Sequence, residues 1–142
     1  CSFRNNTAMN SGGAVHQQFS TLTLISNTDF DSNMVEGSGD CLVDSSCEVR
    51  GGAYYAKDVS MDMYNCTFRN NVAITTSLSQ FAEGGALYLA SDSISTDSSS
   101  ISNCTFLNNS AQGRGDNNAG GYGGGIYVKR VRAHFGSQGV YA

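Results

Sequence analysis

The sequence predicts an all-β fold, a right-handed parallel β-helix in which about four coils of chain stack into a solenoid. Three observations support this prediction. Two short motifs alternate along the chain, so the chain is built from an internal repeat. Its apolar segments, such as Leu22 to Ile25 and Leu87 to Leu89, are too short for helices and lie between glycines and asparagines. Proline is absent, as expected where every strand amide donates a hydrogen bond to its neighbour.

The first motif has the form F-x-x-N and anchors the repeat. It occurs at Phe3 to Asn6, Phe30 to Asn33, Phe68 to Asn71 and Phe106 to Asn109. Equivalent residues of successive coils should lie about 4.8 Å apart in parallel ladders. We therefore expect two structural ladders, one of phenylalanines at 3, 30, 68 and 106, and one of asparagines at 6, 33, 71 and 109. Asparagine and glycine suit the corners because they accept backbone conformations that other residues resist.

The second motif is a glycine pair followed by small and apolar residues. It begins at Gly12, Gly51, Gly84 and Gly123, and it alternates strictly with the first motif. The repeat divides the single β-helix segment 1–142 into coils at about 1–11, 12–50, 51–83 and 84–122, with a partial coil at 123–142. Variation in length falls mainly between an F-x-x-N motif and the next glycine pair, which predicts loops at about 37–50, 74–83 and 112–122.

Alignment of the coils also predicts the core. Besides the phenylalanines, two inward stacks are expected, one of Ile25, Met63 and Ile101 and one of Val15, Tyr54, Leu87 and Ile126. Each large side chain should contribute roughly 1.5–3 kcal/mol when buried. The chain starts inside a repeat, without a capping segment, and solenoids need capped ends. We therefore expect it to be an uncapped fragment of a longer chain.

A row of mostly aromatic residues follows the inward position of the glycine-pair strand. Its members are His16, Tyr55, Tyr88 and Tyr127. Strand alternation places them on the outer face if their predecessors point inward. An exposed row of this kind is a candidate partner face that stacks on sugar rings or anchors a protein. The alternative, which we favour, is ring-on-ring support of the coil stack, worth about 0.5–1.5 kcal/mol per pair.

The cysteines fall into two groups. Cys1, Cys66 and Cys104 share one aligned position, where Thr28 stands in the intervening coil, and parallel side chains there suit a ladder of reduced, buried thiols. Cys41 and Cys47 lie in a predicted loop and form a candidate disulfide if the protein is secreted. The spacing of the cysteines does not indicate a metal site, and we expect no cofactor.

Four sequons make Asn5, Asn65, Asn103 and Asn108 candidate glycosylation sites. Turns use asparagine often, so these motifs also arise without modification. Asn65 and Asn103 have a further alternative, because they could form an inward or corner ladder of hydrogen bonds that blocks modification.

Composition and charge restrict the function. The formal net charge of −4 gives no footprint for nucleic acid, and no apolar run approaches the roughly 20 residues of a transmembrane helix. Acidic residues do not recur at one aligned position, so the paired carboxylates of a glycoside hydrolase are not indicated. The basic run Lys129 to Arg132 is interpreted as a solvated strand end, with docking of an acidic partner as the alternative.

The motifs resemble a known family. Gly84 to Tyr88 alternates with Asn65 to Asn71 and Asn103 to Asn109 in the way of the GGA(I/L/V) and F-x-x-N repeats of chlamydial polymorphic membrane proteins. Similar repeats occur in other parallel β-helix proteins of the pectin-lyase-like class. The resemblance implies an extracellular or surface-displayed β-helix, often an adhesin, a passenger stalk or a filament component.

Together, pattern and resemblance predict a non-enzymatic structural and adhesive segment of a larger extracellular or cell-surface protein. Its expected partners are other protein chains, copies of itself and surface glycans. Two alternatives stay open. One is a subunit of an extracellular filament or appendage, and the other is a pectin-lyase-like polysaccharide lyase or hydrolase, which would need acids that converge in a groove.

Overall fold

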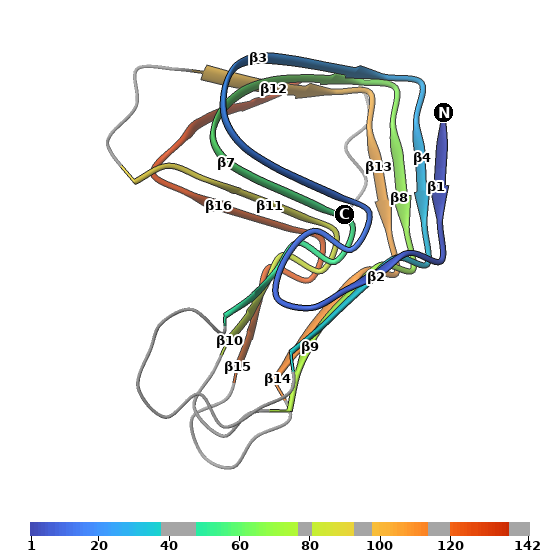
Figure 1. Cartoon of the computed structure of the whole chain (residues 1–142). Helices are drawn as coiled ribbons and strands as arrows, with labels where there is room; N and C mark the ends of the chain where they lie inside the picture. The colour runs from blue at the N-terminus through green and yellow to red at the C-terminus, as the bar shows by residue number, and fades with distance from the viewer. Residues whose placement is uncertain (38–47, 77–80, 93–97, 114–119, 137–142) are drawn as a thin grey trace.

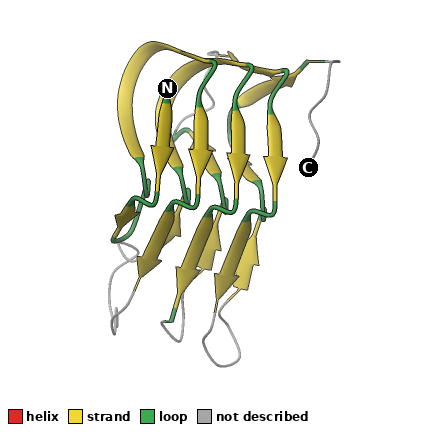
Figure 2. Cartoon of the chain, turned by 90° about the vertical axis from the view of Figure 1, so that its right-hand side faces the viewer, coloured by secondary structure: helices red, strands yellow, loops and turns green. Residues whose placement is uncertain are grey.

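The computed structural model describes residues 1–37, 48–76, 81–92, 98–113 and 120–136, and it confirms the predicted solenoid. The described residues form strands joined by turns, with parallel pairing throughout. Successive coils lie side by side, so equivalent strands form rows along the stack (Figures 1 and 2). In the described residues, no helix has the length and apolar character needed to span a membrane.

The F-x-x-N motifs form the first sheet. Its strands, in spatial order, are β1 (Ser2–Arg4), β4 (Asp29–Asp31), β8 (Thr67–Arg69) and β13 (Thr105–Leu107). Their register pairs Phe3 with Phe30, Phe30 with Phe68, and Phe68 with Phe106. Each strand is three residues long, because the corner residue that follows has a positive φ, as Asn70 does at 55°.

After this corner the chain enters a second sheet. It consists of β2 (Thr7–Ala8), β5 (Met34–Gly37), β9 (Val72–Thr75) and β14 (Ser110–Gly113). A third sheet follows, made of β6 (Val49–Arg50), β10 (Phe81–Glu83) and β15 (Gly120–Tyr122). Val49 and Ala82 of the third sheet pack against Val35 and Ala73 of the second, forming a small buried cluster.

The loops predicted at 37–50, 74–83 and 112–122 are too long, because each range contains strand residues of the second and third sheets. Each of these ranges begins with the end of a strand of the second sheet and ends with a whole strand of the third. The error has a physical reason. Strands of two or three residues with glycine or a single apolar side chain give no periodic signal, and they form only because neighbouring coils supply hydrogen-bond partners.

The glycine pairs turn the chain into the fourth sheet. Gly51 has a φ of 65°, which an L side chain resists, whereas a Cβ on Gly52 would collide with the carbonyl oxygen of Gly85 in the next coil. The motif therefore needs glycine twice, first for conformation and then for the close approach of two backbones.

The fourth sheet contains the longest strands and curls over the top of the molecule (Figure 1). Its strands β3 (Val15–Ser26) and β7 (Tyr54–Tyr64) are continuous, with a register shift between Ser20 and Thr23. In the later coils two strands take the place of one: β11 (Leu87–Ala90) with β12 (Ser98–Ser102), and β16 (Ile126–Lys129) with β17 (Arg132–Phe135). The partial last coil thus continues as far as Phe135.

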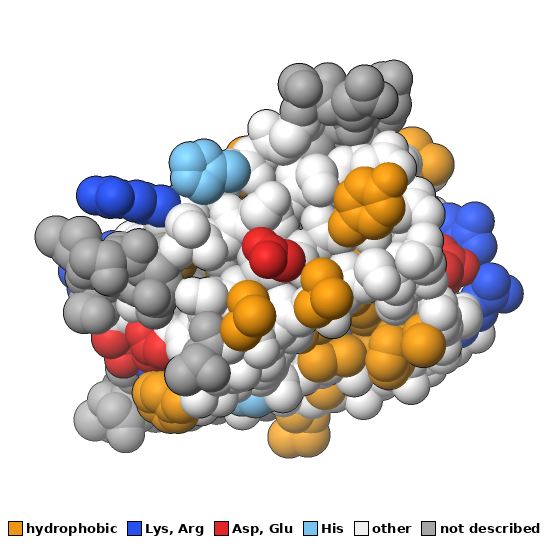
Figure 3. Space-filling model, turned by 90° about the horizontal axis from the view of Figure 1, so that it is seen from above, with side chains coloured by type: hydrophobic (Ala, Val, Ile, Leu, Met, Phe, Trp, Pro, Cys, Tyr) orange, Lys and Arg blue, Asp and Glu red, His pale blue; other side chains and the backbone are white. Residues whose placement is uncertain are grey.

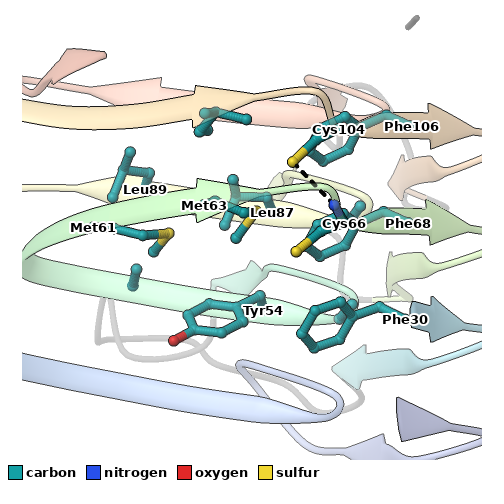
Figure 4. Packing of buried hydrophobic residues seen from close by; sticks show 14 of the residues in the cluster. Phe30, Tyr54, Met61, Met63, Cys66, Phe68, Leu87, Leu89, Cys104 and Phe106 are labelled. Atoms are coloured by element: carbon teal, nitrogen blue, oxygen red, sulfur yellow. Dashed lines mark hydrogen bonds between the residues drawn. The ribbon is translucent and has the colours of Figure 1, made fainter. Parts of the chain in front are cut away.

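The main core lies inside the coils, between the first and fourth sheets. Phe30, Phe68, Met63, Leu87 and Ile101 are at most 1% exposed there (Figure 4). The stacks of Ile25, Met63 and Ile101 and of Val15, Tyr54, Leu87 and Ile126 pair in register around them. Burial of these side chains offsets the entropy lost in ordering a chain rich in small polar residues.

Candidate functional site

The phenylalanine ladder is a continuous stack of parallel rings. Ring centroids lie 5.1 Å apart between Phe3 and Phe30, 4.5 Å between Phe30 and Phe68, and 4.7 Å between Phe68 and Phe106. The planes of each pair diverge by 6° or less. Parallel strands impose this geometry, because equivalent Cβ atoms of neighbouring coils point in the same direction.

The asparagine ladder runs beside the phenylalanine stack. Asn71 shows its pattern: the side-chain Oδ1 accepts from the backbone N–H and from Nδ2 of Asn33, each at 3.0 Å. Its own Nδ2 donates to the carbonyl oxygen of Phe30 at 3.0 Å and to Oδ1 of Asn109 at 2.9 Å. Asn6 donates to Asn33 in the same way, so four coils are joined.

In the middle coils this ladder is buried and its hydrogen bonds are complete. Asn33 and Asn71 are 0% exposed, yet both side-chain N–H groups and the oxygen have partners. A buried amide without partners would cost about 1–3 kcal/mol, whereas a satisfied network favours one register. The role of these residues is thus to lock equivalent positions of successive coils over one another.

A second asparagine ladder lies at an exposed corner and contains two of the sequons. Nδ2 of Asn65 donates to Oδ1 of Asn27 at 2.7 Å, and Nδ2 of Asn103 donates to Oδ1 of Asn65 at 3.1 Å. All three have φ near 50° and are exposed. This is the corner ladder considered from the sequence, and it engages the nitrogen that a glycan would modify.

The other two sequons lie at a different corner. Asn5 and Asn108 are exposed, with φ of 54° and 53°. Both occupy the corner between the first and second sheets, directly before the buried asparagine ladder. The structure thus separates the candidate glycosylation sites into two pairs, and the side chains of only one pair belong to the corner ladder.

Two of the three aligned cysteines contact each other along the stack. Cys66 and Cys104 are free thiols, at most 1% exposed, and the backbone N–H of Cys66 donates to Sγ of Cys104 at 3.4 Å (Figure 4). Cys1, in the first coil, is exposed. The side-chain interaction with the Cys66 thiol, together with burial, raises the pKa of the Cys104 thiol, and this outweighs the backbone N–H bond, which lowers it. The raised pKa disfavours the reactive thiolate form. The candidate disulfide partners Cys41 and Cys47 lie outside the described residues.

A local hydrogen bond recurs at this cysteine position and was not foreseen from the sequence. The thiol of Cys66 donates to the carbonyl of Tyr64 at 3.4 Å, and that of Cys104 donates to the carbonyl of Ser102 at 3.2 Å. Thr28 makes the same bond from its hydroxyl to the carbonyl of Ser26 at 2.9 Å. The sequence does carry a signal for this bond. Threonine replaces cysteine at the aligned position, and both are small side chains that can donate a hydrogen bond.

The row predicted as a partner face is stacked, with centroid distances of 4.5 Å (His16–Tyr55), 5.2 Å (Tyr55–Tyr88) and 5.5 Å (Tyr88–Tyr127). The prediction that these tyrosines are exposed is wrong for the middle of the row. Tyr55 is 4% exposed and Tyr88 is 3% exposed. His16 is exposed and Tyr127 is half-buried.

The shape of the coil explains this burial. At the glycine corner, β10 and β11 diverge so that their outer sides face one another across a concave angle (Figure 1). The guanidinium of Arg50 lies 5.1 Å from the ring centroid of Tyr88, and its Nε donates to Glu83 Oε2 at 3.0 Å. Glu48 is a further ion-pair partner of Arg50. Burial in this corner raises the pKa of the Tyr88 phenol, which favours its neutral form.

Two acidic residues of β4, Asp29 and Asp31, form ion pairs with arginines. Arg69 bridges Asp29 and Asp31, at 3.2 Å and 3.1 Å, and Arg4 reaches Asp29 at 3.0 Å. The hydrogen bond from Ser32 is the largest of the contacts that hold the pKa of Asp31 below its usual value. Among the described residues no group of three or more histidines, cysteines or acids could hold a metal ion.

These ladders define the chain as a repeat protein of the parallel β-helix class, in which each coil is held mainly by its two neighbours. A model of the Chlamydia polymorphic membrane protein repeat matches residues 1–18, which contain one F-x-x-N motif and one glycine pair. The match suggests a surface-associated protein. No curated protein and no solved structure matches the chain.

Proposed function

We propose that the chain is a non-enzymatic structural and adhesive segment of an extracellular or cell-surface protein. In this proposal the stacked coils form a rigid rod, and its outer face contacts other protein chains or further copies of the same chain. The observation that carries the proposal is the buried asparagine ladder. It commits one residue of every F-x-x-N motif to holding the coils in register rather than to binding a small molecule.

Exposed apolar side chains support a contact function. Phe19, Leu22 and Leu24 of β3 are 76%, 66% and 74% exposed, respectively. Hydrophobic side chains are visible on the face of the molecule that is seen from above (Figure 3). Clusters of exposed apolar residues commonly mark protein contacts. The match to a repeat of membrane proteins of Chlamydia supports display at a surface.

The environment of the acidic residues supports a non-enzymatic role. Asp29 and Asp31 neutralise Arg69, and Asp58 accepts hydrogen bonds from the hydroxyl of Ser91 at 2.8 Å and the backbone N–H of Asp92 at 2.9 Å. These carboxylates therefore have structural partners. A glycoside hydrolase instead needs two carboxylates on opposite sides of one sugar bond.

An adhesion assay tests the proposal. Beads coated with the 142-residue chain should adhere to cultured cell monolayers, or cluster with one another, more than beads coated with albumin do. Beads coated with the same chain after heat unfolding are the matched control, and their adhesion should be lost. Equal adhesion of folded-chain and albumin beads would contradict the adhesive role.

A separate assay tests the non-enzymatic part. The chain is incubated with neutral and acidic polysaccharides, and the formation of new reducing ends or unsaturated products is measured. We expect no product above the background of a buffer control. Steady release of product that scales with protein concentration would contradict this part and favour the lyase or hydrolase alternative.

A further inference from the structure

A small pocket lies in the concave corner between the third and fourth sheets. Its volume is about 130 Å³, and four cationic side chains line it: Arg50, Lys57, Lys129 and Arg130. The methyl group of Ala90 also contributes to the lining. This volume is well below the roughly 300 Å³ of the smaller pockets that enclose a whole organic ligand, and it equals about four water molecules. The pocket therefore fits one compact polar group.

The strand register brings two of these cations together. Ala90 of β11 pairs with Lys57 of β7 on one side and with Lys129 of β16 on the other. The two lysines therefore stand on the same side of the sheet, about 10 Å apart along the stack, with only a methyl group between them. A small residue between two long cationic side chains leaves space over the strand where an anion can lie.

Of the four cations that line the pocket, Lys57 and Arg50 form ion pairs with carboxylates. Lys57 Nζ lies 2.8 Å from Asp92 Oδ2, and Arg50 is held by Glu83. Arg130 Nη1 donates to the backbone carbonyl of Asp92 at 3.1 Å, and no carboxylate of the described residues forms an ion pair with it. Lys129 has no ion-pair partner within the described ranges.

Among the described residues, Asp92 is the one carboxylate in the lining of the pocket. Its side chain is 73% exposed. The turn that carries it is fixed by Asp58, whose Oδ1 accepts from the backbone N–H of Asp92. The excess of positive charge therefore lies on the side of Lys129 and Arg130, where an incoming anion would replace water.

We propose that this pocket binds a tetrahedral oxyanion, a sulfate or phosphate group, which bridges Lys129 and Lys57 over Ala90. Ammonium groups bind such an anion as point charges, and the guanidinium of Arg130 adds hydrogen-bond donors in a fixed plane. The site does not rest on the proposed function, because its four cationic residues and Ala90 belong neither to the phenylalanine and asparagine ladders nor to the exposed apolar side chains of β3.

A titration followed by NMR tests the site. The 142-residue chain is titrated at constant ionic strength with inorganic sulfate, inorganic phosphate, a sulfated heparin disaccharide and the same disaccharide without sulfate. The backbone amide signals of Ser91 and Arg130 should shift with the three oxyanions and not with the desulfated sugar. Tighter binding of the sulfated disaccharide than of free sulfate would identify a sugar-borne group as the ligand, and the reverse would identify the free ion. Both results support the site.

Two variants and a control make the test specific. Lys129→Gln should weaken sulfate binding about tenfold, because it removes one charge-assisted hydrogen bond to the anion. Arg132→Gln removes the same charge from exposed β17, outside the pocket, and should leave binding unchanged. Ala90→Leu should abolish binding, because the larger side chain fills the pocket. The melting temperature of this variant is measured to show that it is folded. Equal weakening by Arg132→Gln, or no shift with any oxyanion, would overturn the proposal.

Discussion

The two asparagine ladders make the same contact in different surroundings. In both, Nδ2 of one coil donates to Oδ1 of a neighbouring coil, as in Asn71 to Asn109 and Asn103 to Asn65. The first ladder is buried beside the phenylalanine stack in the middle coils, at Asn33 and Asn71, and the second is exposed at a corner. In addition, the corner asparagines have positive φ, whereas Asn33 and Asn71 do not.

The difference shows that asparagine has two distinct structural roles in this repeat. In the buried ladder the side chain matters, because its amide satisfies backbone groups that water cannot reach. At the corner the backbone matters, because asparagine tolerates the left-handed conformation that the turn requires. The same inter-coil hydrogen bond should thus contribute much to stability in one place and little in the other.

The largest effect is expected for Asn71→Ala. This change leaves the N–H groups of Asn33 and the carbonyl of Phe30 without their partners in the core. The free energy of unfolding should fall by about 4 kcal/mol, measured by urea denaturation. A fall below about 1 kcal/mol would show that the buried ladder does not hold the coils.

A smaller effect is expected in the outer aromatic row. Tyr88→Ser should lower the free energy of unfolding by about 3 kcal/mol, because it removes a buried ring stacked on both sides. Tyr127→Ser, which removes a half-buried ring, should cost about 1 kcal/mol in the same denaturation experiment. Loss of partner binding by Tyr88→Ser without loss of stability would favour the partner-face alternative instead.

At the corner, Asn65→Ala should cost about 1 kcal/mol of unfolding free energy. Alanine disfavours the φ of 52° found there, while the lost side-chain hydrogen bond is exposed and competes with water. Thermal or urea denaturation of Asn65→Ala and Asn71→Ala in parallel compares the contributions of the two ladders to stability. Equal costs for the two variants would refute the distinction between the ladders.

The smallest effect is expected for Asn65→Gly, which separates the backbone from the side chain at the corner. Glycine adopts a positive φ without steric cost, so the free energy of unfolding should change by less than about 0.5 kcal/mol. If Asn65→Gly and Asn65→Ala are equally destabilised, the side-chain bond to Asn27 carries the stability instead.

The sequence predicted the parts of the fold whose motifs recur in successive coils. Phenylalanine, asparagine and the glycine pair occupy equivalent positions in successive coils, because stacked coils need the same side chain or corner at each of these positions. The strands around Val49 and Ala82 could not be predicted in this way, because they are short and lack alternation. Their positions depend on hydrogen bonds between coils, which are contacts distant in the sequence.

The candidate site was predicted less completely for a related reason. Strand alternation placed Tyr88 on the outer face of the strand whose Leu87 points inward. Burial of the Tyr88 ring, however, depends on the angle between two sheets. The pocket over Ala90 likewise combines residues from β6, β7, β11 and β16. Such convergence follows from the curl of the coil and leaves no local pattern in the sequence.

The most direct test of the account is whether equivalent side chains lie over one another in solution. Nuclear Overhauser effects between the ring protons of Phe30 and Phe68, and between the side-chain amides of Asn33 and Asn71, measure this proximity. With ring centroids 4.5 Å apart, strong cross-peaks are predicted for the phenylalanines. Assigned spectra without cross-peaks at both pairs would contradict the stacked β-helix.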